Sequence, residues 1–368
     1  MGQFNGCSVS RKRIQTLRRT LLLSAGLALS AALASAGTIT YTCDPSVAAA
    51  TCNYLNTTVA GLYSSTFTNA NANIYIQYGT TGLASTNSFY NDFSYSSYLS
   101  ALNSNPTKDA LQVSALSALN TYDAAPYSSG NVELTDALAT ALGLTTGLTG
   151  TTAAGAACSF PSAGCYNAVV TVTNDPGTPL YYDNLGGPEA ADAYDFYATV
   201  EHETDEVLGT SSCITTQTTP LSDGCDFTDE PSAVDLFRYF GVGQLVLDSS
   251  LSTTAGAYFS YNGGATNGAI GIGGSPKYYN TLDNGDDYAD YVSSTPDCGT
   301  NQAVQDAEGC PGEDAGLNIL NDGGSEINIL NAVGYDLQQP AATPEPGTLF
   351  LLGGGLAVLI GLKHRRRA

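Results

Sequence analysis

The chain has 368 residues, and its 34 acidic residues outnumber the 12 basic ones. Nine of the basic residues lie in the first 19 or the last six positions, so residues 37–340 carry 33 acids, three bases and a net charge near −30. Such a surface repels phosphate backbones, which excludes nucleic-acid binding, and it attracts cations.

The N-terminus has the pattern of a secretory signal peptide. Basic residues precede an apolar run at residues 21–29, and the small residues Ala34-Ser35-Ala36 follow it. A transmembrane anchor is the alternative, but the run is short and is broken by Ser24 and Gly26. We predict that signal peptidase cleaves after Ala36 and removes residues 1–36.

Residues 37–340 form the exported body, which is long enough for one large domain or two modest ones. Runs of β-branched and aromatic residues that end in turn residues predict strands. Helical spacing of apolar residues before a glycine predicts helices. The expected elements are strand 72–78, helices 111–119 and 132–144, strand 168–172, helix 189–208, strands 244–247 and 257–261, and helix 328–333. The expected fold class is α+β.

Residues 341–368 have the pattern of a sorting tail. Pro344-Glu345-Pro346 precedes an uncharged stretch at 346–362, and an arginine-rich end follows. As a helix that stretch is about 25 Å long, just enough to span a bilayer with the basic end in the cytoplasm. The tail resembles the PEP-CTERM sorting signal of Gram-negative bacteria, also called the ice-binding protein C-terminal motif. The resemblance implies processing by an exosortase at the inner membrane, then transfer to the cell surface or extracellular matrix; a simple tail anchor is the alternative.

Eight cysteines remain after removal of the signal peptide, and they fall into four neighbouring pairs. An even number in an exported chain indicates disulfides, although the sequence alone does not fix their pairing. The grouping favours local bridges that staple loops rich in Gly, Ser and Thr. The expected bridges are Cys43–Cys52, Cys158–Cys165, Cys213–Cys225 and Cys298–Cys310.

One helix carries a metal-binding pattern. His202 is the single histidine of the body, and on a helix Glu206 lies one turn away on the same face. The two side chains could hold one metal ion, with Glu203 beside them to deprotonate a water bound to it. Glu201 and Asp205 are expected to point away into solvent. An acidic surface helix with a chance histidine is the alternative.

The segment Val200-Glu201-His202-Glu203-Thr204-Asp205-Glu206-Val207-Leu208-Gly209 resembles the helix of zincin metallopeptidases. It is more similar to the zincin-like metalloproteases that carry PEP-CTERM tails, with Val-Glu-His-Glu-x-x-Glu-Val-x-Gly. The similarity extends over about residues 55–337, through blocks at 235–239, 257–264, 285–291 and 329–335. It implies a zincin-like metallopeptidase body, a zinc ion, a peptide or protein substrate, and Glu203 as general base.

The pattern departs from ordinary zincins because Glu206 stands in place of their second histidine. The remaining ligand must be a carboxylate or water, and the first candidate is Asp235, before Glu230. Such a set is anionic and hard, so it would activate a zinc-bound water less strongly than neutral imidazoles do, and it would tolerate Mn²⁺ or Ca²⁺ as well as Zn²⁺. Tyr239 or Arg238 is the candidate oxyanion donor, with a packing role as the alternative.

Two Asp-rich loops, 283–287 and 321–326, offer oxygens that Ca²⁺ could use, although acidic surface loops are the commoner explanation. Together these features predict an exported, zinc-dependent endopeptidase at the cell surface or in the matrix. The alternative is a non-catalytic surface or matrix protein with structural metal or calcium sites.

Overall fold

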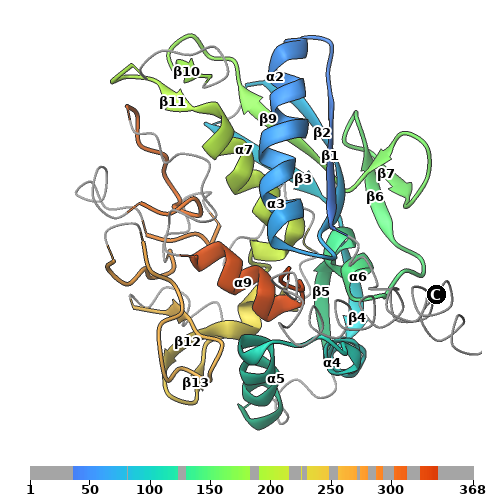
Figure 1. Ribbon diagram of the computed structural model, residues 1–368, viewed down its shortest axis with the longest axis vertical. Helices are drawn as coiled ribbons and strands as arrows, with labels where there is room; N and C mark the ends of the chain where they lie inside the picture. Colours follow the sequence, from blue (N-terminus) through green and yellow to red (C-terminus); the bar gives the residue numbers. More distant parts are fainter. Residues whose placement is uncertain are drawn as a thin grey trace, which may run out of the picture. The chain divides into compact units, whose positions relative to one another are not determined.

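A computed structural model describes residues 36–80, 82–122, 130–182, 190–214, 225, 230–247, 256–271, 274–280, 287–292, 302–312 and 324–338. These residues form a mixed α+β structure (Figure 1), so the predicted fold class is confirmed, while the zincin-like architecture remains a prediction. The signal peptide and the predicted span at 346–362 lie outside the described residues. Within the described ranges, no helix is both long and apolar enough to cross a bilayer.

The central sheet has four strands in the order β1 (Thr38–Cys43), β2 (Asn71–Gly79), β9 (Ala168–Thr173) and β3 (Ala84–Ser88). The first three strands are parallel, and β3 runs antiparallel to β9 at one edge. Alternate residues of β2 are buried on one face, as its partial alternation predicted. The strands expected at 72–78 and 168–172 are thus confirmed as β2 and β9.

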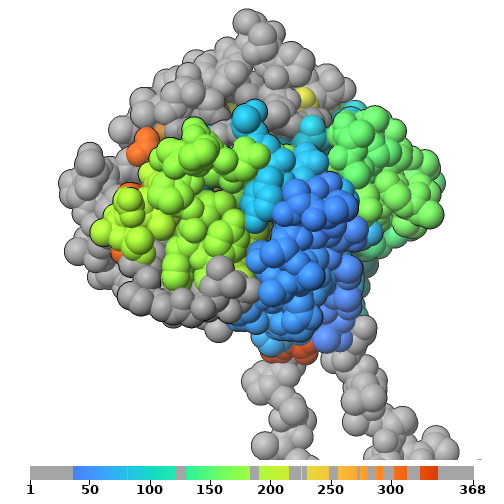
Figure 2. All heavy atoms as spheres, turned by 90° about the horizontal axis from the view of Figure 1, so that it is seen from above, coloured from blue at the N-terminus to red at the C-terminus, as the bar shows by residue number. Residues whose placement is uncertain are grey.

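One face of this sheet packs against two helical segments. The first runs from α2 (Ala49–Tyr54) through the π-helical η2 (Leu55–Val59) into α3 (Ala60–Thr66), and the second is α7 (Phe196–Asp205). Tyr41 of β1 and Tyr63 of α3 both bond to α7, through Thr204 Oγ1 at 3.0 Å and Asp205 Oδ1 at 2.8 Å. In Figure 2 the first segment (blue) lies between the β6–β8 sheet (green) and the β10, β11 and α7 region (yellow-green).

The expected helix 132–144 is wrong in its first third. Residues Asn131–Thr135 form β5, which pairs antiparallel with β4 (Tyr90–Ser94), and only Asp136–Ala141 form a helix, α6. Strand pairing outweighs helix propensity in residues 132–135. Thr135 then caps the helix, because its Oγ1 accepts from Leu138 N at 3.2 Å.

The expected helix 189–208 begins later than predicted. Tyr194–Asp195 form β11, parallel to β10 (Leu180–Tyr181), and α7 begins at Phe196. Asp195 caps it by accepting from Tyr197 N and Ala198 N at 2.7 and 3.0 Å. The helix continues as the π-helical η4 (Glu206–Thr210) and ends at Gly209, whose φ of 111° favours glycine, so the predicted stop is confirmed.

Among the described residues the other helices are α4 (Tyr95–Ser104), α5 (Ala110–Tyr122) and α9 (Ser325–Val333), and the last two confirm the helices expected at 111–119 and 328–333. The same residues form two further small sheets. One joins β7 (Ala157–Ser159), β6 (Thr149–Thr152) and β8 (Cys165–Tyr166). The other joins β13 (Gln244–Leu245), β12 (Arg238–Gly241) and β14 (Tyr258–Phe259), after the 3₁₀ turn η5 (Val234–Phe237). The strands expected at 244–247 and 257–261 are therefore present but shorter.

Three of the four expected disulfides are confirmed: Cys43–Cys52, Cys158–Cys165 and Cys213–Cys225. Cys310 is disulfide-bonded as well. Its expected partner Cys298 lies outside the described residues, so that pairing stays a prediction.

Candidate metal centre

His202 is oriented by a backbone carbonyl. Its Nδ1 lies 2.9 Å from the carbonyl oxygen of Val304, so Nδ1–H donates to that oxygen, and in the neutral ring the lone pair is on Nε2. Metal-binding histidines commonly use one ring nitrogen in this way and present the other to the ion. The sequence predicted His202 as a ligand; the structure adds the contact that fixes its ring.

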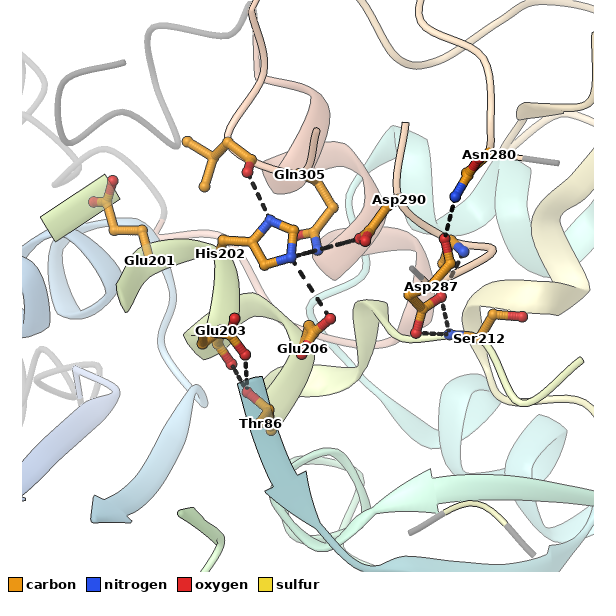
Figure 3. Close-up of polar contacts among 12 residues, drawn as sticks. Thr86, Glu201, His202, Glu203, Glu206, Ser212, Asn280, Asp287, Asp290 and Gln305 are labelled. Carbon is orange, nitrogen blue, oxygen red and sulfur yellow. Dashed lines mark hydrogen bonds and ion pairs between the residues drawn. The ribbon is translucent and has the colours of Figure 1, made fainter. Parts of the chain in front are cut away.

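Two carboxylates converge on His202 Nε2 (Figure 3). Glu206 Oε1 and Asp290 Oδ1 each lie 3.6 Å from it, and potential ligand atoms of all three residues lie within 4.8 Å of one another. A separation of 3.6 Å exceeds a hydrogen bond. In a tetrahedral site with metal–ligand bonds of about 2.0–2.2 Å, two ligand atoms are roughly 3.3–3.6 Å apart. The observed separations are close to that distance. The spacing therefore fits a divalent cation.

Asp235, the third ligand expected from the sequence, is not in this group. Its carboxylate is buried and accepts hydrogen bonds from Ser212 Oγ at 2.6 Å, Cys213 N at 3.0 Å, and both N and Oγ of Ser232 at 2.9 Å. Those bonds tie η5 to the segment that follows α7. The structure brings Asp290, not Asp235, to His202 and Glu206.

Glu230, the second choice, lies in another acidic group with Asp92 and Glu133. Asp92 and Glu133 face each other across β4 and β5, which explains why these carboxylates are close. The structure therefore does not bring Glu230 to the ligand group of His202.

Arg238 holds the segment that carries Asp290. Its Nη2 donates to the carbonyl of Asn280 at 3.0 Å and its Nη1 to the carbonyl of Tyr288, and the guanidinium lies 4.7 Å from the ring centroid of Tyr279. With 1 % of its surface exposed, Arg238 has no access to a substrate on the surface. The Arg238 side chain holds two interior carbonyl groups. These contacts agree with the packing role that was the alternative to an oxyanion role.

Tyr239, the other oxyanion candidate, lies on β12 opposite Tyr258 and Leu245 and is fully buried. Its hydroxyl therefore does not reach the surface on which a substrate would lie. Both candidate oxyanion donors are thus buried, and the oxyanion role stays a prediction.

Glu203 lies beside the ligand group and is 5 % exposed. Thr86 of the edge strand β3 donates to its Oε2 at 2.5 Å. Burial, and then the carboxylate of Glu206, raise the pKa of Glu203 well above its ordinary value. The carboxyl group of Glu203 therefore holds a proton more readily than a carboxyl group in solvent does.

Burial and two neighbouring carboxylates act in opposite directions on the pKa of His202. Burial lowers its pKa, but the carboxylates of Asp290 and Glu206 outweigh burial and raise the pKa well above the ordinary value. The site thus concentrates negative charge in a poorly solvated region, where either a proton or a cation offsets it.

Glu201 and Asp205, expected in solvent, are both fully buried, so that expectation is wrong. Figure 3 shows Glu201 on the side of the helix away from the ligand group. The helix is enclosed on several sides because α3 and β1 cover the turn that was expected to face water. Tyr63 OH, for example, contacts Asp205 Oδ1 at 2.8 Å and the carbonyl of Glu201 at 3.2 Å.

Sequence reasoning missed four residues at the site: Thr86, Asp290, Val304 and Gln305. Asp290 belongs to the block 285–291, which is part of the resemblance to the zincin-like metalloproteases, so the sequence contains a signal for this segment. Thr86, Val304 and Gln305 belong to no motif, and only the tertiary fold brings them to His202 and Glu203.

The PEP-CTERM protein-sorting motif matches residues 342–367, which confirms the predicted sorting tail. No curated protein and no solved structure matches the chain. The motif implies an exported protein that is processed by an exosortase and sorted to the cell surface. Because the match covers the tail alone, the likeness of the body to metalloproteases stays a prediction, as do cleavage by signal peptidase and membrane anchoring.

Proposed function

We propose that the protein is an exported metal-dependent endopeptidase of the cell surface or extracellular matrix. The observation that carries the proposal is the convergence of His202 Nε2, Glu206 Oε1 and Asp290 Oδ1 at cation-ligand spacing, with Glu203 on the same helix. One nitrogen and two carboxylates suit Zn²⁺ or Mn²⁺. A divalent cation there supplies Lewis acidity, which polarises a carbonyl and lowers the pKa of water.

In the proposed reaction Glu203 serves as the base. Hydrolysis of a peptide bond adds water across the C–N bond, so a base must take a proton from water and return it to the leaving amine. Thr86 fixes one carboxylate oxygen of Glu203 at 2.5 Å, and the carboxyl group lies on the helix that carries His202, beside the ligand group.

The position of β3 also supports a peptide substrate. It is an edge strand of the central sheet, and Thr86 on it contacts Glu203. An extended peptide can add to such an edge through main-chain hydrogen bonds, which would place its backbone beside the base.

The alternative is a non-catalytic surface protein in which the metal only holds the chain together. It is favoured by the low exposure of the ligands, with side-chain values of 17 % for His202, 13 % for Glu206 and 7 % for Asp290. Asp290 lies 88 positions after His202 in the chain, so a bound cation would cross-link its segment to the helix that carries His202 and Glu206.

Two measurements on the purified full chain test the proposal. Elemental mass spectrometry should find about one transition-metal ion per chain, lost in His202→Ala. Glu203→Gln should keep the metal and abolish cleavage of an unfolded protein substrate. Full proteolysis by Glu203→Gln would refute its role as base, whereas metal retained without any cleavage by the unaltered protein would support the structural alternative.

A further inference from the structure

Gln305 brings an amide group to the same point as the three candidate ligands. Its Nε2 lies 3.4 Å from His202 Nε2 and 3.0 Å from Asp290 Oδ1 (Figure 3). The backbone of Gln305 is fixed on both sides, because its N–H donates to Glu326 Oε1 at 3.0 Å and its carbonyl accepts from Tyr291 N at 2.8 Å. The amide is therefore held at the ligand group by the fold.

The oxygen of this amide is unsatisfied. Gln305 is fully buried, and its Oε1 has no hydrogen-bond partner among the residues that the structure describes. Buried polar atoms usually have partners, so such an oxygen calls for an explanation. A carbonyl oxygen is also a metal donor, whereas the NH₂ group beside it is not.

A half-turn about the last side-chain torsion exchanges the two ends of the amide without moving the backbone, because NH₂ and O have nearly the same shape. Oε1 would then stand where Nε2 stands, 3.4 Å from His202 Nε2 and 3.0 Å from Asp290 Oδ1. Together with the two 3.6 Å separations, these values are the spacings of ligands around one cation. In either orientation one polar atom of the amide, Oε1 or Nε2, points away from the ligand group. The orientation is therefore decided by the partner at the ligand group: a cation favours Oε1 there, and the Asp290 carboxylate alone favours Nε2.

We propose that Gln305 is a fourth protein ligand of the cation, through Oε1. The inference rests on the metal site of the proposed function and is independent of proteolysis. In the absence of a cation the NH₂ group donates to Asp290, and cation binding turns the amide over.

A fourth ligand changes which cation suits the site. The donors become one nitrogen and three oxygens, a hard set that suits Mn²⁺ or Ca²⁺. Four protein ligands complete a tetrahedral zinc site, as in structural zinc, while Mn²⁺ and Ca²⁺ take six or more ligands and keep positions for water. The identity of the cation therefore bears on whether the site can take part in hydrolysis.

The test is calorimetric titration of Mn²⁺ and Zn²⁺ into the EDTA-treated and desalted full chain. Gln305→Leu keeps much of the side-chain volume but has no donor atom, and it should weaken binding of both ions at least tenfold. Gln305→Glu keeps an oxygen and adds charge, so it should bind at least as tightly as the unaltered protein. Gln302→Ala, in the same segment and only partly buried, is the matched control and should bind normally.

Thermal unfolding in EDTA checks that each variant folds. If Gln305→Leu does not fold, Gln305→Glu decides: equal or tighter binding supports the proposal and tenfold weaker binding overturns it. Unchanged or tighter binding by folded Gln305→Leu also overturns it, because the amide would then serve only as a donor to Asp290. So does a complete lack of cation binding by the unaltered protein. A chain that binds through Gln305 but cleaves nothing would refute the peptidase proposal alone.

Discussion

Thr86 of the edge strand β3 donates its hydroxyl hydrogen to Oε2 of Glu203 across 2.5 Å, in a contact where both side chains are 5 % exposed. The same hydroxyl lies 3.2 Å from the carbonyl oxygen of Glu203. The bond joins the central sheet to the helix that carries His202. It fixes a carboxyl group beside the ligands that is not itself one of the candidate ligands.

Replacing Thr86 by valine should therefore disturb Glu203 in two ways. Val has the shape of Thr without the hydroxyl, so Thr86→Val leaves a buried carboxyl oxygen unsatisfied and should lower the free energy of unfolding by about 1–3 kcal/mol. If Glu203 is the base, kcat should fall at least tenfold with little change in KM, because binding does not use the hydroxyl. Urea unfolding and steady-state kinetics measure the two effects.

Thr86→Ser is the matched control, because it restores the hydroxyl and should recover most of both losses. A Thr86→Val protein with unchanged stability would mean that the contact with Glu203 contributes nothing.

Asp290 and Asp235 make a matched pair of substitutions that separates ligand binding from folding. Asp290→Asn removes a charged ligand and should weaken cation binding at least tenfold with a smaller effect on folding in EDTA. Asp235→Asn replaces a carboxylate oxygen by NH₂ among the buried donors around it, including Ser212 Oγ and Cys213 N. It should cost about 2–4 kcal/mol of stability and leave the affinity of the folded protein unchanged. The reverse pattern would restore Asp235 as the ligand expected from the sequence.

The sequence predicted the parts of this molecule that depend on local patterns. Sorting-motif order, cysteine grouping and the β-branched run at 168–172 are all short-range signals, and the structure or the family match bears them out. Glu206 likewise follows His202 by one helical turn, so a local period was enough to bring the two together.

The predictions that were wrong concern features that depend on contacts between distant segments. Residues 132–135 were expected to begin a helix, yet pairing with β4 makes Asn131–Thr135 a strand. Asp290 lies 88 positions after His202, and a buried arginine, Arg238, holds its segment in place. The burial of Glu201 follows from the packing of α3 and β1 on α7. The acidic sequence of this helix does not predict that packing. No local pattern carries such information.

Asp195 tests where the helix of the metal site begins. Its Oδ1 accepts from Tyr197 N and Ala198 N, two of the N–H groups that lack partners in the first turn. Asp195→Ala should therefore destabilise the protein by roughly 1 kcal/mol, within a range of about 0.5–2. Asp195→Asn should lose less, because asparagine is also a good cap. Urea unfolding measures both.

The sign of this effect decides between the two helix boundaries. If the helix began near Pro188, as the sequence predicts, Asp195 would lie in its interior and alanine, the better helix former, would be neutral or stabilising. Asp192→Ala, at an exposed position three residues earlier, controls for the loss of one negative charge.

Asp136 should make stability fall as the pH rises toward alkaline values. Its carboxyl group is fully buried in α6, with Oδ1 accepting from Asn167 Nδ2 at 2.7 Å, and burial raises its pKa from 3.8 to about 8 despite that bond. Between these two values the folded chain keeps a proton that the unfolded chain releases. The stabilisation is complete below about pH 4 and is lost as the pH passes through about 8.

Asp136→Asn removes this titration while keeping the shape and the acceptor for Asn167. Between about pH 4 and 8 the unaltered protein should therefore lose up to about 1.4 kcal/mol of unfolding free energy per pH unit relative to the variant. Urea unfolding at several pH values between 5 and 9, with the exposed Asp192→Asn as charge control, gives the slope. A difference independent of pH between 5 and 9 would show that Asp136 is already ionised in the folded chain at pH 5, so that its pKa is not raised.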